Sequence, residues 1–247
     1  MFSAIALGSN AAYVIALLVC LAEAYACGSI PFAILIGRNL YGIDVREHGS
    51  GNTGATNVLR VLGVRAGLSV LLLDVLKGAL AVVIARFILS YAAGDAAAAV
   101  GEAHGILGLG WQWDLALLLT AIFAVLGHCI SPWLSFKGGK GVACSLGVIA
   151  AMMPPVALGL IVVFVTVVFL ARYVSLGSVL AAASLPFLIL LFYPGSPLLL
   201  GFGVALAAVV IGAHHANIGR LIKGTERKFS VGNAKRKDQK DPGDDAE

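Results

Sequence analysis

The sequence is poor in charge, and this scarcity excludes a soluble globular domain. Of its 247 residues, 12% are charged and 60% are hydrophobic, whereas a soluble domain has about a quarter of its residues charged. The apolar runs are continuous, rich in Ala and Leu, and close to the ~20 residues with which a helix crosses a bilayer. Because a backbone in lipid must satisfy its own hydrogen bonds, we predict an all-α, polytopic membrane protein.

N-terminal basic residues and paired cysteines are also lacking. Their absence argues against a cleavable signal peptide and against a cysteine-based disulfide or metal framework. No Lys or Arg precedes Arg38, so the basic segment of a cleavable signal peptide is missing. The four cysteines form no CxxC motif and lie in or beside apolar runs. They are typical of small buried side chains rather than of a disulfide framework or a metal site.

Motifs of several common enzyme classes are absent. There is no GxSxG, so a hydrolase triad is unsupported, and no His is followed five residues later by Asp, as in the HxxxxD acyltransferases. No paired-Asp motif is available to hold Mg²⁺, which argues against enzymes that transfer phosphoalcohols from nucleotide diphosphates. We therefore expect neither a metal ion nor a cofactor.

The distribution of basic residues orients the chain in the membrane. Seven apolar runs predict transmembrane helices at about 11–36, 68–91, 115–130, 142–153, 155–171, 176–192 and 198–213. Apart from Lys77 and Arg86, every Lys and Arg falls in one set of loops or in the tail. The positive-inside bias places those loops and the C-terminus in the cytoplasm, and the N-terminus outside, in the periplasm. We predict one domain over 1–227, a charged, disordered tail over 228–247, and no nucleic-acid partner.

A glycine-rich stretch at 49–57 interrupts the hydrocarbon and is followed by an arginine. Three glycines within six residues let the backbone bend closely around a ligand, and successive N–H groups in such a loop can bind an anion. The pattern favours a phosphate-binding loop, although a flexible polar loop between two helices would look similar. The candidate residues are Gly49, Ser50, Gly51, Asn52, Gly54, Thr56, Asn57 and Arg60.

A second polar segment, residues 131–141, ends immediately before an apolar helix. Lys140 is surrounded there by Gly138, Gly139 and Gly141, and Lys137 precedes them. A helix N-terminus favours an anion, so this segment is a second candidate phosphate site. It is not a Walker A loop, because no Ser or Thr follows the lysine. A basic loop required only by topology is the alternative, but topology does not require three glycines.

A third polar segment, residues 214–226, follows the last apolar run. If that helix continues, His214 and Asn217 share one face, with Arg220 close by, and they can orient a hydroxyl-bearing substrate; an interfacial histidine is the alternative. Ser175 and Ser178 lie at the cytoplasmic start of the sixth predicted helix, where they can donate to a ligand or cap the helix. Since all three segments share one side of the membrane, we predict a site there for more than one phosphate.

These motifs, taken in order, make the sequence similar to the bacterial acyl-phosphate:glycerol-3-phosphate acyltransferases, the PlsY family. The matching stretches are GSIPF at 28–32, GIDVR at 42–46, GSGNTGATNVLR at 49–60, FKGGKG at 136–141, and HxxNIxRL with GTE at 214–226. The resemblance implies a seven-helix enzyme of the bacterial inner membrane, with a cytoplasmic active site. It implies transfer of a fatty acyl group from acyl phosphate to the 1-hydroxyl of sn-glycerol 3-phosphate, which opens phospholipid synthesis. The residues it marks as essential are Ser50, Arg60, Lys140, His214 and Asn217.

Two questions stay open at this level. The proton of the acceptor hydroxyl can pass to the phosphate of the donor or to His214, whose ordinary pKa of ~6.5 suits a base. A transporter for a phosphorylated metabolite is the alternative function, but it would place its binding groups near the bilayer midplane. Only Glu23, Asp74 and Lys77 lie that deep, and they favour a structural pairing. We expect a monomer.

Overall fold

The computed structural model describes residues 2–99 and 111–229, and every regular element within them is helical. Most of the predicted tail, residues 230–247, lies outside the described residues. The helices are α1 (Phe2–Ser29), α2 (Phe32–Tyr41), η1 (Val45–Glu47), α3 (Ala55–Leu62), α4 (Val64–Ala99), α5 (Trp111–Cys129), η2 (Pro132–Leu134), α6 (Val142–Met152), α7 (Pro154–Ala171), α8 (Val174–Phe192), α9 (Pro197–Ala213) and α10 (His215–Ile222).

Five helical stretches are long and apolar enough to cross a membrane, and a sixth is formed if α9 and α10, which meet at 63°, count as one span. The prediction of an all-helical, multi-pass chain is therefore confirmed in this coarser form. The remaining predicted span corresponds to α6, which has 11 residues. At 1.5 Å per residue it is about 16 Å long, roughly half of a bilayer's hydrocarbon core.

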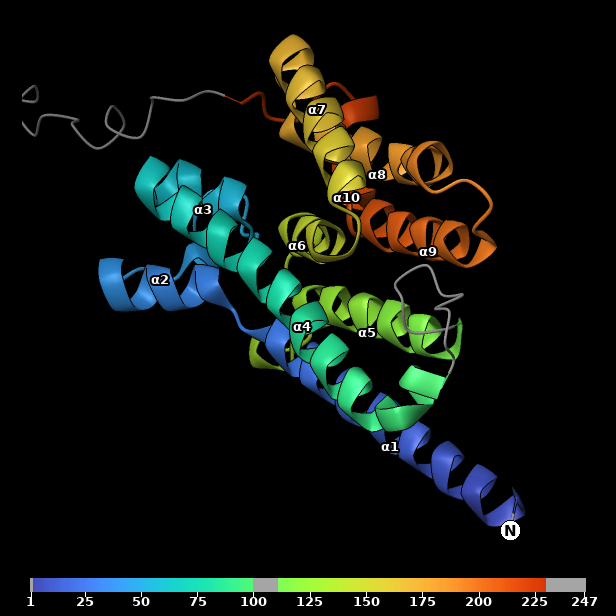
Figure 1. Ribbon diagram of the computed structural model, residues 1–247. Helices are drawn as coiled ribbons and strands as arrows, with labels where there is room; N and C mark the ends of the chain where they lie inside the picture. Colours follow the sequence, from blue (N-terminus) through green and yellow to red (C-terminus); the bar gives the residue numbers. More distant parts are fainter. Residues whose placement is uncertain (1, 100–110, 230–247) are drawn as a thin grey trace, which may run out of the picture.

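Pro31 divides the first predicted helix into two. α1 ends at Ser29 and α2 begins at Phe32, because proline lacks an N–H and disfavours helical geometry in the residue before it. Figure 1 shows α2 turning away from the line of α1. The helix predicted over 11–36 is thus two helices, although together they count as one candidate membrane span, Ala11–Tyr41.

The polar stretch expected as a loop after α2 contains a short helix, α3. Its apolar side chains join a small cluster with α4: Val58 is fully buried beside Val45, Ala66 and Val70. The burial of this face stabilises eight helical residues that are too few to be stable alone. As a result, the glycine-rich stretch is held between η1 and α3 rather than loose.

Two groups of helices meet at α6. α1 packs on α4 and α5, while α7, α8 and α9 pack in sequence, and α6 lies between α4 and the second group (Figure 1). Glycine permits the closest approach: a Cβ at Gly78 or Gly147 would overlap a backbone carbonyl across the α4–α6 contact. Small residues at such contacts are typical of membrane helices.

An ion pair lies inside the bundle. Asp74 and Lys77 are 2.6 Å apart, each with a side chain 4% exposed. The Nζ of Lys77 also donates to the carbonyl of Ile30 at 2.9 Å, at the break between α1 and α2. The predicted pairing is confirmed for these two residues. It does not extend to Glu23, whose buried carboxylate oxygens find no hydrogen-bond partner among the described residues.

Candidate functional site

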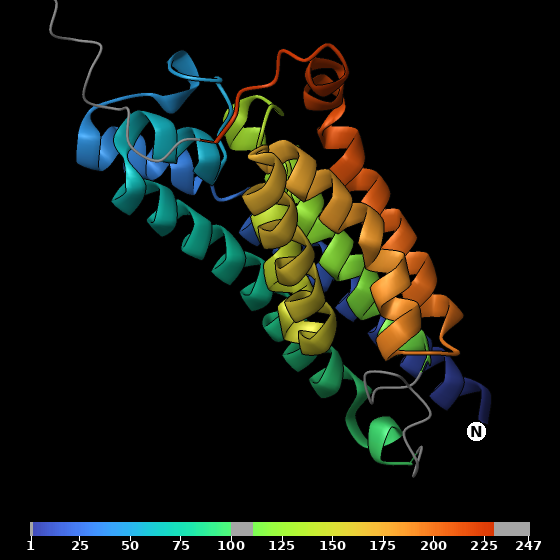
Figure 2. The same ribbon diagram turned by 90° about the horizontal axis from the view of Figure 1, so that it is seen from above.

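The three polar segments come together at one end of the bundle. Figure 2 shows the loop before α3, the loop before α6 and the segment after α9 gathered at the same end. A cavity of about 580 Å³ opens between them, lined by residues from all three segments. Segments more than 150 positions apart in the chain thus contribute to one site, as the sequence predicted.

Asn57 organises the glycine-rich stretch. Its Nδ2 donates to the carbonyls of Val45 and His48 at 2.9 and 3.2 Å, and its Oδ1 accepts from the backbone N–H and the hydroxyl of Ser50 at 2.7 and 3.1 Å. Gly49 has φ of 65°, and a Cβ there would overlap the Asn57 amide, so glycine is required. Ser50 is exposed and lines the cavity.

The start of α3 brings further groups to the cavity wall. Gly54 is its N-cap and supplies no side-chain cap, while Asn52 accepts from the Gly54 N–H at 2.9 Å. Thr56 and Arg60 are four residues apart and so lie on one face of the helix, and both line the cavity. Burial lowers the pKa of the Arg60 guanidinium, as does its neighbour Arg227.

The second segment folds back on the end of α5. The N–H groups of Gly138 and Gly139 donate to the carbonyls of Cys129 and His128, each at 3.0 Å. A Cβ at Gly139 would overlap the His128 ring, so the approach requires glycine. These glycines, together with Gly141, which begins α6 with φ of 79°, shape the backbone and are not among the residues that line the cavity.

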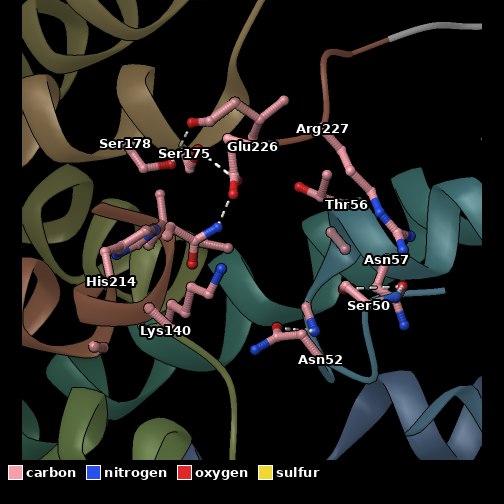
Figure 3. A pocket seen from close by; sticks show the side chains of 18 of the residues that line it. Ser50, Asn52, Thr56, Asn57, Lys140, Ser175, Ser178, His214, Glu226 and Arg227 are labelled. Atoms are coloured by element: carbon pink, nitrogen blue, oxygen red, sulfur yellow. Dashed lines mark hydrogen bonds between the residues drawn. The ribbon is translucent and has the colours of Figure 1, made fainter. Parts of the chain in front are cut away.

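The folded-back segment brings Lys140 to the cavity. Lys140 lines the cavity, and Figure 3 shows its ammonium directed into the space between His214 and Asn52. Burial, which disfavours the charged form, lowers the pKa of Lys140 to about 8; Glu226 opposes this, while Arg220 and Arg60 add to it. Lys137 is exposed and, like Gly51, lies outside the cavity lining.

His214 lies at the bend between α9 and α10. The chain turns by 63° here, so the predicted continuation of one straight helix is replaced by a bend that still brings His214 and Asn217 to the same cavity. The Nδ1 of His214 is 2.8 Å from the carbonyl of Val210. Since a carbonyl only accepts, Nδ1 carries the proton, and Nε2 of the neutral ring is an acceptor.

Glu226 is the functional candidate that the pattern analysis missed. Its Oε1 accepts from the Ser175 hydroxyl at 2.7 Å and from the Asn217 amide at 2.6 Å, and its Oε2 accepts from Arg220 at 2.7 Å. Partial burial would raise the pKa of Glu226, but these hydrogen bonds lower it. Three predicted site residues, Ser175, Asn217 and Arg220, are therefore engaged by a carboxylate. Ser178, also in the lining, donates to the carbonyl of Val174 at 2.9 Å.

Cationic charge exceeds anionic charge around the cavity. Of the carboxylates that line it, Asp74 is paired with Lys77 and Glu226 with Arg220. Within the described residues, no carboxylate lies within ion-pair distance of the remaining lining cations, Arg60, Lys140 and Arg227. Unpaired guanidinium and ammonium groups are the strongest donors to phosphate.

The cavity lining also includes apolar side chains. They come from α4, α6, α7 and α8, namely Leu71, Val142, Ala143, Phe164 and Val174. The cavity thus combines cations that have no carboxylate partner among the described residues with hydrocarbon side chains. Across residues 2–99 and 111–229 no group of three or more His, Cys, Asp or Glu residues is arranged to hold a metal ion.

Known proteins are similar to this chain in sequence and in fold. The family model described as Glycerol-3-phosphate acyltransferase matches residues 18–224. A relative of that name from Trichlorobacter lovleyi is 48% identical over 214 residues, which cover 85% of this chain and 96% of the relative. The fold is similar to the crystal structure of PlsY, an integral membrane glycerol 3-phosphate acyltransferase, in its glycerol 3-phosphate form (TM-score 0.71, 38% identity, 87% of this chain and 96% of that chain). The lysophosphatidic acid form of PlsY gives a TM-score of 0.70 at 37% identity over the same shares of the two chains.

Proposed function

The chain belongs to the glycerol-3-phosphate acyltransferase family, and on that premise we propose that it transfers a fatty acyl group from acyl phosphate to the 1-hydroxyl of sn-glycerol 3-phosphate. The products are 1-acyl-sn-glycerol 3-phosphate and inorganic phosphate, in the first step of phospholipid synthesis. The observation that carries the proposal is a single cavity lined both by Arg60 and Lys140, which have no carboxylate partner among the described residues, and by apolar side chains.

The proposed topology has seven spans, with α6 as the short one, in the bacterial inner membrane. The N-terminus is outside, and the C-terminus and the cavity face the cytoplasm, where both substrates are available. The excess of Lys and Arg at the cavity end supports this orientation. We further propose that residues 1–227 act as one domain and that the protein is a monomer.

The proposed chemistry uses position and charge, without a covalent intermediate. Acyl phosphate is a mixed anhydride whose leaving group departs easily. The 1-hydroxyl oxygen attacks the carbonyl carbon, the bond from that carbon to the phosphate oxygen breaks, and the hydroxyl proton passes to the departing phosphate. Holding both substrates in line supplies much of the acceleration. Lys140 and Arg60 stabilise the charge that develops on the carbonyl and phosphate oxygens.

The remaining residues orient the substrates. His214 presents an unprotonated Nε2, and Asn217 has its amide nitrogen committed to Glu226, so each offers an acceptor to a glycerol hydroxyl. Ser50 and the N–H groups of its loop bind phosphate. Three glycines, Gly138, Gly139 and Gly141, contribute indirectly, because they allow the backbone fold that brings Lys140 to the cavity. The other residues of the proposed binding set are Gly49, Gly51, Asn52, Gly54, Thr56, Asn57, Lys137, Ser175, Ser178 and Arg220.

The experiment that tests the function separates an enzyme from a transporter. Purified protein in detergent receives labelled sn-glycerol 3-phosphate with either acyl phosphate or acyl-CoA, and the same protein in sealed vesicles is assayed for uptake of the label. We expect labelled lysophosphatidate from acyl phosphate only, and no uptake. Uptake without product would instead support a transporter, whose binding site we would expect near the midplane rather than at one end of the bundle.

A further inference from the structure

A strap of five residues, 225–229, crosses the mouth of the cavity after α10. Glu226 is bound to Ser175 near the start of α8, and the N–H of Phe229 donates to the carbonyl of Arg172 at 2.6 Å. Of the two residues between these anchors, Arg227 and Lys228, the first lines the cavity. The strap is thus fixed on both sides of Arg227 to the junction of α7 and α8.

The direction of Arg227 differs from that of its neighbours. Lys228 lies over the ring of Tyr173, with its Nζ 5.9 Å from the ring centre, whereas Arg227 extends across the cavity and donates to the carbonyl of Gly49 at 3.3 Å. Figure 3 shows the Arg227 side chain descending from the strap to Ser50 and Asn57. A distance of 3.3 Å is beyond the usual range of ~2.7–3.2 Å for such a bond, so a stronger acceptor can displace this carbonyl.

Arg227 also has no charge partner of its own in the part of the chain that the structure describes. Its neighbour Glu226 is turned toward Arg220, at 2.7 Å. Arg227 and Arg60 line the same cavity and are close enough that Arg227 lowers the pKa of the Arg60 guanidinium. An anion between the two guanidinium groups would remove this repulsion, and a phosphate can accept two parallel hydrogen bonds from each fork.

We propose that Arg227 binds the phosphate group of a substrate together with Arg60, and that the strap, anchored at Glu226 and Phe229, holds Arg227 over this side of the cavity. The inference rests on the proposed function for the identity of the phosphate compounds. Both sn-glycerol 3-phosphate and acyl phosphate carry the required chemistry. Arg227 is a substrate-binding residue in this account. The two anchors of the strap fix the backbone of Arg227, so that its side chain reaches Gly49.

Kinetics of three variants test this proposal. Arg227→Gln removes the cation, Arg227→Lys keeps the charge but not the fork, and Lys228→Gln is the matched control because it removes one positive charge from the same strap outside the cavity. KM is measured for each substrate with the other at saturation. We expect Arg227→Gln to raise the KM of one substrate about tenfold or more, with a smaller change in kcat, Arg227→Lys to lie between it and wild type, and Lys228→Gln to change KM less than twofold.

The substrate whose KM rises identifies the phosphate that Arg227 binds. Two results would overturn the inference: both KM values unchanged in Arg227→Gln, or equal increases in the two Gln variants, which would mean that only the position of the strap matters.

A measurement on the wild-type protein tests the proposal even if a variant does not fold. Wild-type protein is treated with an arginine-specific dicarbonyl reagent, with and without sn-glycerol 3-phosphate or inorganic phosphate, and the modified arginines are mapped by mass spectrometry. We expect phosphate to slow modification of Arg227 several-fold, while the exposed Arg172 reacts unchanged. Equal modification of Arg227 in all samples would contradict the proposal. Because no turnover is needed, this result is independent of whether the proposed acyl transfer occurs.

Discussion

The amide of Asn217 donates to the carboxylate of Glu226 at 2.6 Å, and this bond ties α10 to the strap that follows it. The same carboxylate accepts from Ser175 on α8. One half-buried acid on the strap therefore positions residues from both α8 and α10. The bond also fixes the orientation of Asn217, because its nitrogen faces Glu226 and its oxygen is the end that can accept from a substrate.

Replacing Glu226 tests this positioning. In Glu226→Gln, one carboxylate oxygen becomes an NH₂ group that cannot accept from Arg220, and hydrogen bonds to charged groups are worth about 1.5–3 kcal/mol. We expect about a tenfold loss of kcat/KM and a lower unfolding temperature, with a larger loss in Glu226→Ala. The exposed carboxylate Glu47 provides the control, Glu47→Gln. Wild-type activity in Glu226→Ala would show that the network is dispensable.

Removing Arg60 or Lys140 should largely abolish turnover without preventing folding. Arg60→Ala and Lys140→Ala each remove a donor to charge that develops during the reaction, and such donors contribute about 10²–10³ in kcat. We expect losses of that size with unchanged membrane insertion and size-exclusion profiles. Arg65→Ala removes a nearby exposed cation outside the cavity and should retain activity. Normal turnover in both cavity variants would refute the site assignment.

The pH profile should report Lys140. Burial lowers its pKa to about 8, and the lysine must be protonated to bind phosphate. The charged form is present below that pKa and is lost as the pH rises through it. We expect kcat/KM to fall above pH about 8, and the fall to move to higher pH in Lys140→Arg, because arginine stays charged. A profile that is identical in Lys140→Arg would assign the fall to another group.

The identity of the proton acceptor is tested at His214. If the departing phosphate takes the proton, His214→Gln should retain more than about a tenth of wild-type kcat, since a glutamine can still bind a hydroxyl, while His214→Ala should lose more. General-base catalysis contributes about 10²–10⁴. A loss of that size in His214→Gln, measured with both substrates saturating, would make His214 the base.

The buried ion pair predicts a strong asymmetry between single and double variants. Lys77→Met removes the ammonium partner of the buried Asp74 carboxylate and leaves His128, 3.7 Å away, as its remaining basic neighbour. Breaking a buried pair costs about 3–5 kcal/mol, whereas replacing both members by apolar residues is often tolerated. We expect Asp74→Leu with Lys77→Met to unfold at a higher temperature than Lys77→Met alone. Thermal unfolding in detergent measures the difference. Equal unfolding temperatures would indicate that the pair is not coupled.

The long apolar helices could be predicted from the sequence, because continuous hydrocarbon leaves the backbone no other choice in lipid. The ends of α6, α8 and α9 fall within two residues of the predicted ends. α3 was missed because its eight residues are polar enough to read as a loop. Packing of its apolar face, with Val58 against Val45 and Val70, stabilises it, and that packing is not visible in a local pattern.

The site could be predicted where its residues occur in local motifs. Arg60, Lys140, His214 and Asn217 were all found in this way, and all line the cavity. Glu226 also lies in a matching motif, GTE, but its role could not be predicted from it, because that role depends on Ser175, 51 positions away. Lys228 and Phe229 were assigned to the tail from composition, yet they contact Tyr173 and Arg172. Contacts between distant segments explain each of these omissions.

The most direct test of the account is the stoichiometry of the reaction that purified protein catalyses. Acyl phosphate and labelled sn-glycerol 3-phosphate are supplied, and inorganic phosphate and labelled lysophosphatidate are measured together over time. The account predicts that wild type releases one phosphate for each lysophosphatidate formed. It predicts neither product from the double variant that carries both Arg60→Ala and Lys140→Ala. Phosphate release without acylated product, or equal product from the double variant, would contradict it.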